Sequence, residues 1–273
     1  ATGTLAAGGT IGALIPPSIL MIIYGVFAET SVTRVFVAGI TVGLLTAASY
    51  IVVIMLIAAL RKDIVPSQPI GVEKLDGRDV FRTVWPLLAL IGLVFGGLFS
   101  GLFTATEAGA IGAAGAIVLV AITGRLNWTV IRHSVLETLS TCASLFIIGV
   151  GAVMFTRFLG LSGVAGLISS SVAGFELGYF ELMLIIAVIY LILGMFMEPF
   201  GAMLVTLPVL LPVLNAQNID LVFFGVFLVK LLEIGMITPP LGLNLFVASG
   251  LSCMSVLQVA KAAIPSAAVL LTA

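Results

Sequence analysis

Two short stretches of this chain are the strongest indication of its architecture: residues 12–18 read GALIPPS, and residues 235–241 read GMITPPL. Each places a glycine, three further residues and then two prolines in the middle of an apolar run. Proline has no main-chain N–H and clashes with the preceding turn, so a proline pair breaks an α-helix rather than bending it. The carbonyls freed at such a break must be buried in protein or face a polar cavity. The recurrence of the pattern near both ends of the chain predicts two structural repeats.

The composition indicates an integral membrane protein. Of 273 residues, 61% are hydrophobic and 8% are charged, whereas soluble domains carry roughly 25% charged residues. This is too little charge to cover a water-soluble surface. A membrane-spanning helix needs about 20 apolar residues, and the chain offers many such runs. We therefore expect an all-α polytopic membrane protein with apolar segments at residues 1–28, 35–60, 85–106, 108–124, 138–156, 182–197, 199–219, 234–260 and from 262 onwards.

Several classes of protein are excluded by what the sequence lacks. The net charge of −1 and the absence of a basic cluster argue against nucleic-acid binding. The only histidine is His133, so no H-E-x-x-H zinc motif is present, and no phosphate-binding G-x-x-x-x-G-K-[ST] string occurs. Cys142 and Cys253 lie in apolar runs and are expected to be small hydrophobic residues. We expect neither an enzyme, nor an organic cofactor, nor a transition metal.

Positive charge sets the expected orientation. Residues 61–84 contain five Lys or Arg residues, and a second loop two spans later carries Arg125 and Arg132. Cytoplasmic loops are enriched in Lys and Arg, so both loops are expected in the cytoplasm. The loop at residues 29–34 then faces the opposite side of the membrane.

Residues 194–214, GMFMEPFGAMLVTLPVLLPVL, form a third irregular element. Its prolines predict a re-entrant hairpin that turns near Val205–Pro208. Glu198 opens it, and two interpretations stand equally: an intramembrane carboxylate at a functional site, or a negative charge that caps the first helix of the hairpin.

Two other patterns predict packing rather than function. The Gly39-x3-Gly43 and Gly97-x3-Gly101 spacings permit close helix contacts. Lys230 and Glu233, at positions i and i+3 of the helix before the second break, are expected to form a structural ion pair.

The chain resembles the large membrane subunit of tripartite ATP-independent periplasmic (TRAP) transporters over nearly its whole length. The resemblance rests on GTLAAGGTIGALIPPSILMIIYG, GLFTATEAGAIGA, GMFMEPFGAMLVTLPVLLPVL and IGMITPPLGLNLFVASG. It implies an elevator-type fold with two inverted repeats, each with a re-entrant hairpin and a broken helix. Residues 1–60 would end the first repeat, residues 61–84 would be a cytoplasmic or interfacial loop, and residues 85–273 would form the second repeat. The chain would then be a fragment that lacks the N-terminal part and the extreme C-terminus.

The resemblance also implies site residues. One sodium ion would be bound by main-chain and hydroxyl oxygens at the second break, and a second ion by the equivalent positions of the first. These residues are Gly194, Gly235, Thr238 and Leu241 for the second break, and Gly12, Ile15 and Ser18 for the first. The resemblance further implies a substrate cavity lined by Ser18, Glu198, Thr206 and Asn244.

By the same resemblance, the expected function is sodium-coupled uptake of a small organic anion, such as a carboxylate or a sialic-acid-like molecule, across the bacterial inner membrane. A small TRAP membrane subunit and a periplasmic substrate-binding protein would be its partners in the lipid bilayer. The alternative is a sodium- or proton-coupled dicarboxylate carrier that works without a binding protein. Glu107 and Glu198 are the carboxylates that could titrate in a proton-coupled variant.

The orientation can be tested with introduced cysteines. Cysteines at Gln68 or Gly71 should be labelled by an impermeant thiol reagent only from the cytoplasmic side, and one at Ser31 only from outside. Labelling of position 68 from the periplasm would overturn the orientation.

Overall fold

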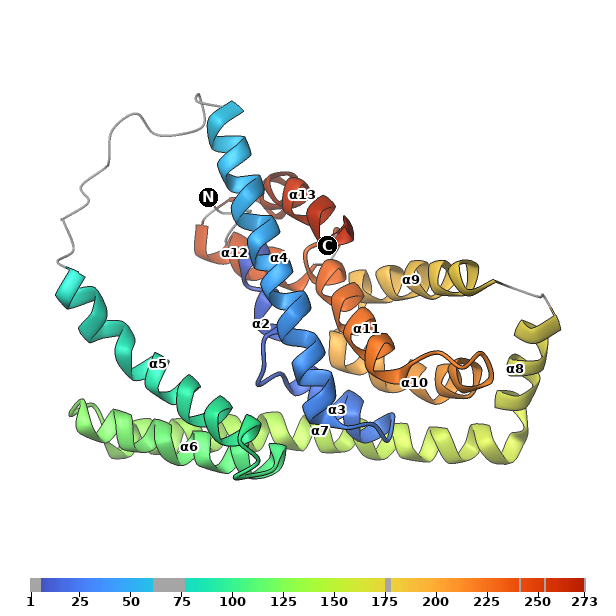
Figure 1. Ribbon diagram of the computed structural model, residues 1–273, viewed down its shortest axis with the longest axis horizontal. Coiled ribbons are helices and arrows are strands. Elements are labelled where there is room, and N and C mark those ends of the chain that lie inside the picture. The colour runs from blue at the N-terminus through green and yellow to red at the C-terminus, as the bar shows by residue number, and fades with distance from the viewer. Residues whose placement is uncertain (1–5, 61–76, 175–177, 241, 253, 273) are drawn as a thin grey trace. The chain divides into compact units, whose positions relative to one another are not determined.

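The computed structural model describes residues 6–60, 77–174, 178–240, 242–252 and 254–272, and all regular elements in these ranges are α-helices (Figure 1). Within the described ranges, five segments are long and apolar enough to cross a membrane: Ala6–Phe27, Val32–Leu60, Trp128–Ser162, Tyr179–Phe196 and Pro199–Ala216. A pair of helices bent by 116°, Leu243–Ser252 and Val256–Ile264, has the composition of one further span. These segments confirm the expected all-α polytopic membrane protein.

The chain forms two compact units, one of residues 1–60 with 147–273 and one of residues 61–146. The end of the predicted first repeat therefore packs with part of the predicted second repeat. The compact units do not follow the predicted boundaries at residues 61–84 and 85–273, because packing joins segments far apart in the sequence. The two repeats themselves remain a prediction.

The unit of residues 61–146 contains α5 (Gly77–Phe99), α6 (Ala105–Ile122) and the start of α7 (Trp128–Ser162). Glu107 belongs to a capping box at the start of α6: its carboxylate accepts from the Thr104 N–H at 2.7 Å, and its own N–H donates to the Thr104 hydroxyl at 3.4 Å. This exposed carboxylate therefore satisfies main-chain donors at a helix end.

Helix α7 is longer than the sequence predicts. The expected amphipathic linker at residues 125–137 and the following span form one helix from Trp128 to Ser162. At 1.5 Å per residue this helix is about 50 Å long, more than the roughly 30 Å of a hydrocarbon core. Its polar first turns carry an exposed His133–Glu137 pair with a nitrogen-to-oxygen distance of 3.5 Å.

In the larger unit, the first proline pair separates α2 (Ile11–Leu14) from α3 (Ile19–Phe27). The following helix, α4 (Val32–Leu60), carries the first small-residue pair. A Cβ atom built on Gly39 would lie 2.9 Å from the Leu14 carbonyl oxygen, and one on Gly43 would lie 3.0 Å from the Ile15 side chain. The prediction that this pair serves packing is confirmed, because both glycines let α4 approach the first break.

The second half of this unit is formed by α8 (Val164–Gly174), α9 (Tyr179–Phe196), α10 (Pro199–Ala216), α11 (Leu221–Met236), α12 (Leu243–Ser252) and α13 (Val256–Thr272). The second proline pair lies between α11 and α12. Both predicted helix breaks are thus present in the structure.

The predicted turn near Val205–Pro208 is wrong. The chain turns at Met197 and Glu198, and α10 then runs without interruption through Pro208 and Pro212. Pro199 occupies the first turn of α10, where a missing N–H costs nothing. Pro208 and Pro212 are separated by a full turn, so each removes a single helical hydrogen bond and the helix persists.

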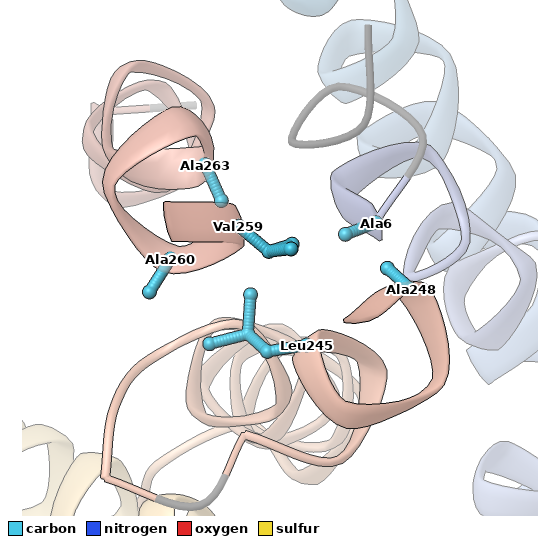
Figure 2. Close-up of a cluster of buried hydrophobic side chains, with 6 residues drawn as sticks. All are labelled: Ala6, Leu245, Ala248, Val259, Ala260 and Ala263. Carbon is cyan, nitrogen blue, oxygen red and sulfur yellow. The ribbon is translucent and has the colours of Figure 1, made fainter. Parts of the chain in front are cut away.

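In two hydrophobic clusters, the N-terminal segment packs against the elements around the second break. Ala7 lies with Tyr50 of α4 and with Ile234 and Ile237 of the second break, and Ile11 packs against this group. The second cluster is drawn in Figure 2, where Leu245 and Val259 point into the space between α12, α13 and the segment that contains Ala6. Its buried members are Ala6, Leu245, Ala248, Val259, Ala260 and Ala263.

Helices α9 and α11 are in direct main-chain contact at two glycine residues, Gly194 and Gly235. A Cβ atom built on Gly235 would lie 2.6 Å from the Cα and carbonyl carbon atoms of Gly194. A Cβ atom on Gly194 would lie 3.1 Å from the Gly235 Cα. Because the obstructing atoms are main chain, they cannot rotate away, and only glycine at position 235 permits this distance.

This contact predicts a graded set of alanine variants of the membrane protein. Gly235→Ala should lower the free energy of unfolding by about 1–3 kcal/mol, the usual cost of overpacking, and Gly194→Ala should cost less. The matched control is Gly201→Ala on α10, whose Cβ would meet only the flexible Met197 side chain at 4.0 Å. Melting temperatures of the purified proteins would check this order, and equal values for Gly235→Ala and Gly201→Ala would contradict the contact.

Candidate functional site

The second break leaves main-chain oxygens without their helical partners. In a continuous helix, the N–H groups at positions 239 and 240 would bond to the carbonyls of Gly235 and Met236, but both positions are proline. The Gly235 carbonyl accepts instead from the Thr238 N–H at 3.1 Å, in a tighter turn. No described residue donates a hydrogen bond to the carbonyls of Met236 and Ile237.

Thr238 lies at this break with its hydroxyl oriented by the main chain. The hydroxyl donates to the Ile234 carbonyl oxygen at 2.6 Å, so its oxygen lone pairs remain available to a ligand. Gly194 lies against Gly235 from α9. The structure therefore brings together three of the four residues predicted for this site, while Leu241 lies outside the described residues.

The first break repeats this arrangement. Pro16 and Pro17 remove the donors that would bond to the carbonyls of Gly12 and Ala13, and no described residue replaces them. Both proline–proline peptide bonds in the chain are cis. Ser18 is buried, and its hydroxyl accepts from the Met21 N–H at 3.4 Å as the N-cap of α3. Gly12, Ile15 and Ser18 thus lie on one short segment around the proline pair.

Both breaks lie in one compact unit, and the segments that lead into them are in contact. Ala7 and Ile11, before the first break, pack against Ile234 and Ile237 at the second. The unit therefore contains, at each of two interrupted helices, neutral main-chain oxygen atoms that lack a helical partner among the described residues. Such oxygens are the ligands preferred by hard cations, and in transporters unwound carbonyls coordinate coupling ions.

Three of the four residues predicted to line a substrate cavity have separate local roles in the structure. Ser18 caps α3, and the Glu198 carboxylate caps α10 by accepting from the Gly201 N–H at 3.1 Å. This geometry favours the capping interpretation of Glu198. Thr206 shares a hydrogen bond with the Tyr190 hydroxyl and donates to the Ala202 carbonyl oxygen at 2.7 Å. Asn244 lies in the first turn of α12, and nothing in the described part of the chain places all four side chains in one cavity.

The ion pair predicted between Lys230 and Glu233 is wrong. The Lys230 ammonium donates instead to the Thr46 hydroxyl of α4, and neither oxygen of the buried Glu233 carboxylate has a hydrogen-bond partner among the described residues. The i, i+3 spacing allowed the pair, but a partner on a neighbouring helix competes for the ammonium group. Two isolated charges in an otherwise apolar helix are the sequence signal that marks these residues.

Comparison with known proteins places this arrangement in a family. Residues 1–273 match the family described as "Tripartite ATP-independent periplasmic transporter, DctM component". The chain is 33% identical to the C4-dicarboxylate TRAP transporter large permease protein DctM of Vibrio cholerae, over 97% of this chain and 62% of the relative. It is 32% identical to the isethionate TRAP transporter permease protein DctMQ of Oleidesulfovibrio alaskensis, over 98% of this chain and 42% of the relative.

A third relative is the sialic acid TRAP transporter permease protein SiaT of Haemophilus influenzae, which is 31% identical over 96% of this chain and 42% of its own length. The chain thus spans about three fifths of the Vibrio cholerae DctM relative, at 62%. The proteins compared are named as transporter permeases rather than enzymes. With two proline-broken helices in one helical membrane unit and a family match over all 273 residues, this chain belongs to the DctM family of TRAP transporter large permeases.

Proposed function

We propose that this chain forms part of a sodium-coupled permease that takes up a small organic anion. The observation that carries the proposal is the pair of helix breaks in one compact unit, each with carbonyl oxygens that lack helical partners. The family supplies the broader context, because its named members are transporter permeases. Sodium coupling is our inference from the chemistry of the breaks.

Sodium suits this chemistry for two reasons. It is a hard cation that is bound by oxygen atoms, and main-chain carbonyls supply these without the cost of burying an opposite charge. At the second break the ligands would be Gly194 and Gly235 through their carbonyls, Thr238 through its hydroxyl, and Leu241. The equivalent ligands at the first break would be Gly12, Ile15 and Ser18.

An organic anion is the substrate class that we favour. The relatives are named for C4-dicarboxylate, isethionate and sialic acid, all of which are acids. After each break a helix begins, α3 at the first and α12 at the second, and helix N-termini attract negative charge. Ser18 and Asn244 lie at these two helix starts and remain candidates for substrate contacts, together with Glu198 and Thr206.

The proposed assembly follows the family. A small membrane subunit and a periplasmic binding protein would complete the transporter in the bacterial inner membrane, and movement would be of the elevator type. The relative named DctMQ is 32% identical to this chain. Substrate counterflow with and without a periplasmic binding protein would distinguish this assembly from a carrier that works alone.

The sodium proposal predicts a difference between two substitutions of Thr238. Thr238→Ala removes the hydroxyl, so the sodium concentration for half-maximal transport by the complete transporter should rise roughly tenfold, which corresponds to the loss of about 1.4 kcal/mol of binding. Thr238→Ser keeps the hydroxyl and is the matched control, which should remain close to the parent. Substrate preference should not change in either variant. An unchanged sodium requirement in Thr238→Ala would remove Thr238 from the site.

A further inference from the structure

A groove runs along the surface of the larger unit between α4 and α11. It consists of two hollows. One, of about 390 Å³, is lined by Thr33 and Arg34 at the start of α4, and the other, of about 470 Å³, reaches Ile234 near the end of α11. The two hollows share the lining residues Ala38, Asp220 and Val222, so they adjoin. We call this continuous hollow the α4–α11 groove, with its mouth at Arg34 and Asp220.

The walls of the α4–α11 groove are apolar. Phe223 and Phe227, one turn apart on α11, are stacked with ring centroids 6.0 Å apart, and both line the larger hollow. Phe223 is 49% exposed, whereas Val226 between them is 5% exposed. The Lys230 ammonium is bound to the Thr46 hydroxyl, so what the lysine offers to the groove is its hydrocarbon stem. Such a surface suits a hydrocarbon chain better than a polar solute.

The mouth of the groove carries one positive and one negative side chain. Arg34 lies in the first turn of α4, and Asp220 is the N-cap of α11, where its Oδ1 atom accepts from the Phe223 N–H at 2.8 Å. Both side chains are exposed, and within the described residues neither forms an ion pair. The mouth therefore offers a guanidinium group and a carboxylate to a ligand that carries both signs of charge.

The groove begins where a lipid headgroup would lie. Helix α4 is one of the segments that can span the membrane, so its first turn, with Arg34, is at the boundary of the bilayer. Along α11, the ten residues from Asp220 to Lys230 cover about 15 Å. This is roughly half of the 30 Å hydrocarbon core, which corresponds to the depth of one leaflet.

We propose that the α4–α11 groove binds one phospholipid with an amine headgroup, of the phosphatidylethanolamine class. Its acyl chain lies along Phe223 and Phe227, its phosphate binds the Arg34 guanidinium, and its ammonium group binds the Asp220 carboxylate. Arginine matches the geometry of phosphate oxygens.

The charges at the mouth select this lipid over other anionic ligands. A phospholipid without an amine would place its negative charge beside Asp220 with nothing to neutralise that carboxylate. A small organic anion would meet the same carboxylate and, in addition, the apolar walls. The site uses none of the proposed sodium ligands, so it does not depend on the proposed transport function.

The headgroup can be tested by lipid binding to the purified, delipidated complete transporter, measured by native mass spectrometry. The probes are dioleoyl phosphatidylethanolamine and dioleoyl phosphatidylglycerol, which share their acyl chains and differ in the amine. The wild type should prefer phosphatidylethanolamine. Asp220→Asn removes the charge but keeps a good N-cap residue, and it should bind both lipids equally. Equal binding by the wild type, or an unchanged preference in Asp220→Asn, would overturn the proposal.

The phosphate contact has its own variant. Arg34→Gln should weaken the binding of both lipids roughly fivefold, which corresponds to about 1 kcal/mol. The matched control is Arg125→Gln, an exposed arginine outside the groove, which should bind like the wild type. Equal affinities in the two variants would remove Arg34 from the site.

The acyl chain is tested by filling the groove. Ala38 lines both hollows, so Ala38→Phe should abolish the headgroup-selective binding. Ala48→Phe places the same side chain at an exposed position of α4, and binding should persist there. Selective binding that survives in Ala38→Phe would contradict the proposal. If Ala38→Phe does not fold, the Asp220→Asn and Arg34→Gln proteins decide, because both changes are at exposed positions and leave the apolar walls intact.

Discussion

Two proline pairs inside apolar helices impose the constraint on which the larger unit depends. Each pair removes two main-chain donors from a segment where water cannot replace them. At the second break one freed carbonyl, that of Gly235, is recovered by a tight turn from Thr238, whereas the carbonyls of Met236 and Ile237 have no donor among the described residues. Helices of the same compact unit pack beside both breaks, and in our proposal the oxygens without helical partners serve as cation ligands.

Glycine residues allow the neighbouring helices to approach the two breaks closely. The contact of Gly194 with Gly235 brings α9 to the second break, and Gly39 and Gly43 bring α4 to the first. The same helix α4 supplies Thr46, which holds Lys230 of α11. One set of close helix contacts thus positions the proposed sodium ligands and the buried contact between α4 and α11.

Much of this arrangement is predictable from the sequence, because helix breaks and small-residue contacts are local or recurrent signals. The composition predicts the membrane-spanning helices, and the proline pairs predict both breaks. The turn at Met197 and Glu198 is not predictable in this way, because separated prolines such as Pro208 and Pro212 are tolerated within one helix. The partner of Lys230 escapes prediction for a different reason. Thr46 is far away in the sequence, and only the packed structure shows which of two candidate acceptors receives the ammonium group.

The central claim is that the open backbone at the second break binds sodium, and the most direct test is the sodium-dependent shift in melting temperature of the purified complete transporter with Pro239 and Pro240 both replaced by alanine. Each proline disfavours a continuous helix by roughly 3 kcal/mol, so the double variant can close the helix and withdraw its carbonyls. The account predicts a protein that folds and melts at least as high as the parent without sodium, but whose melting temperature no longer rises when sodium is added. A double variant that keeps the full sodium-dependent shift would contradict the account.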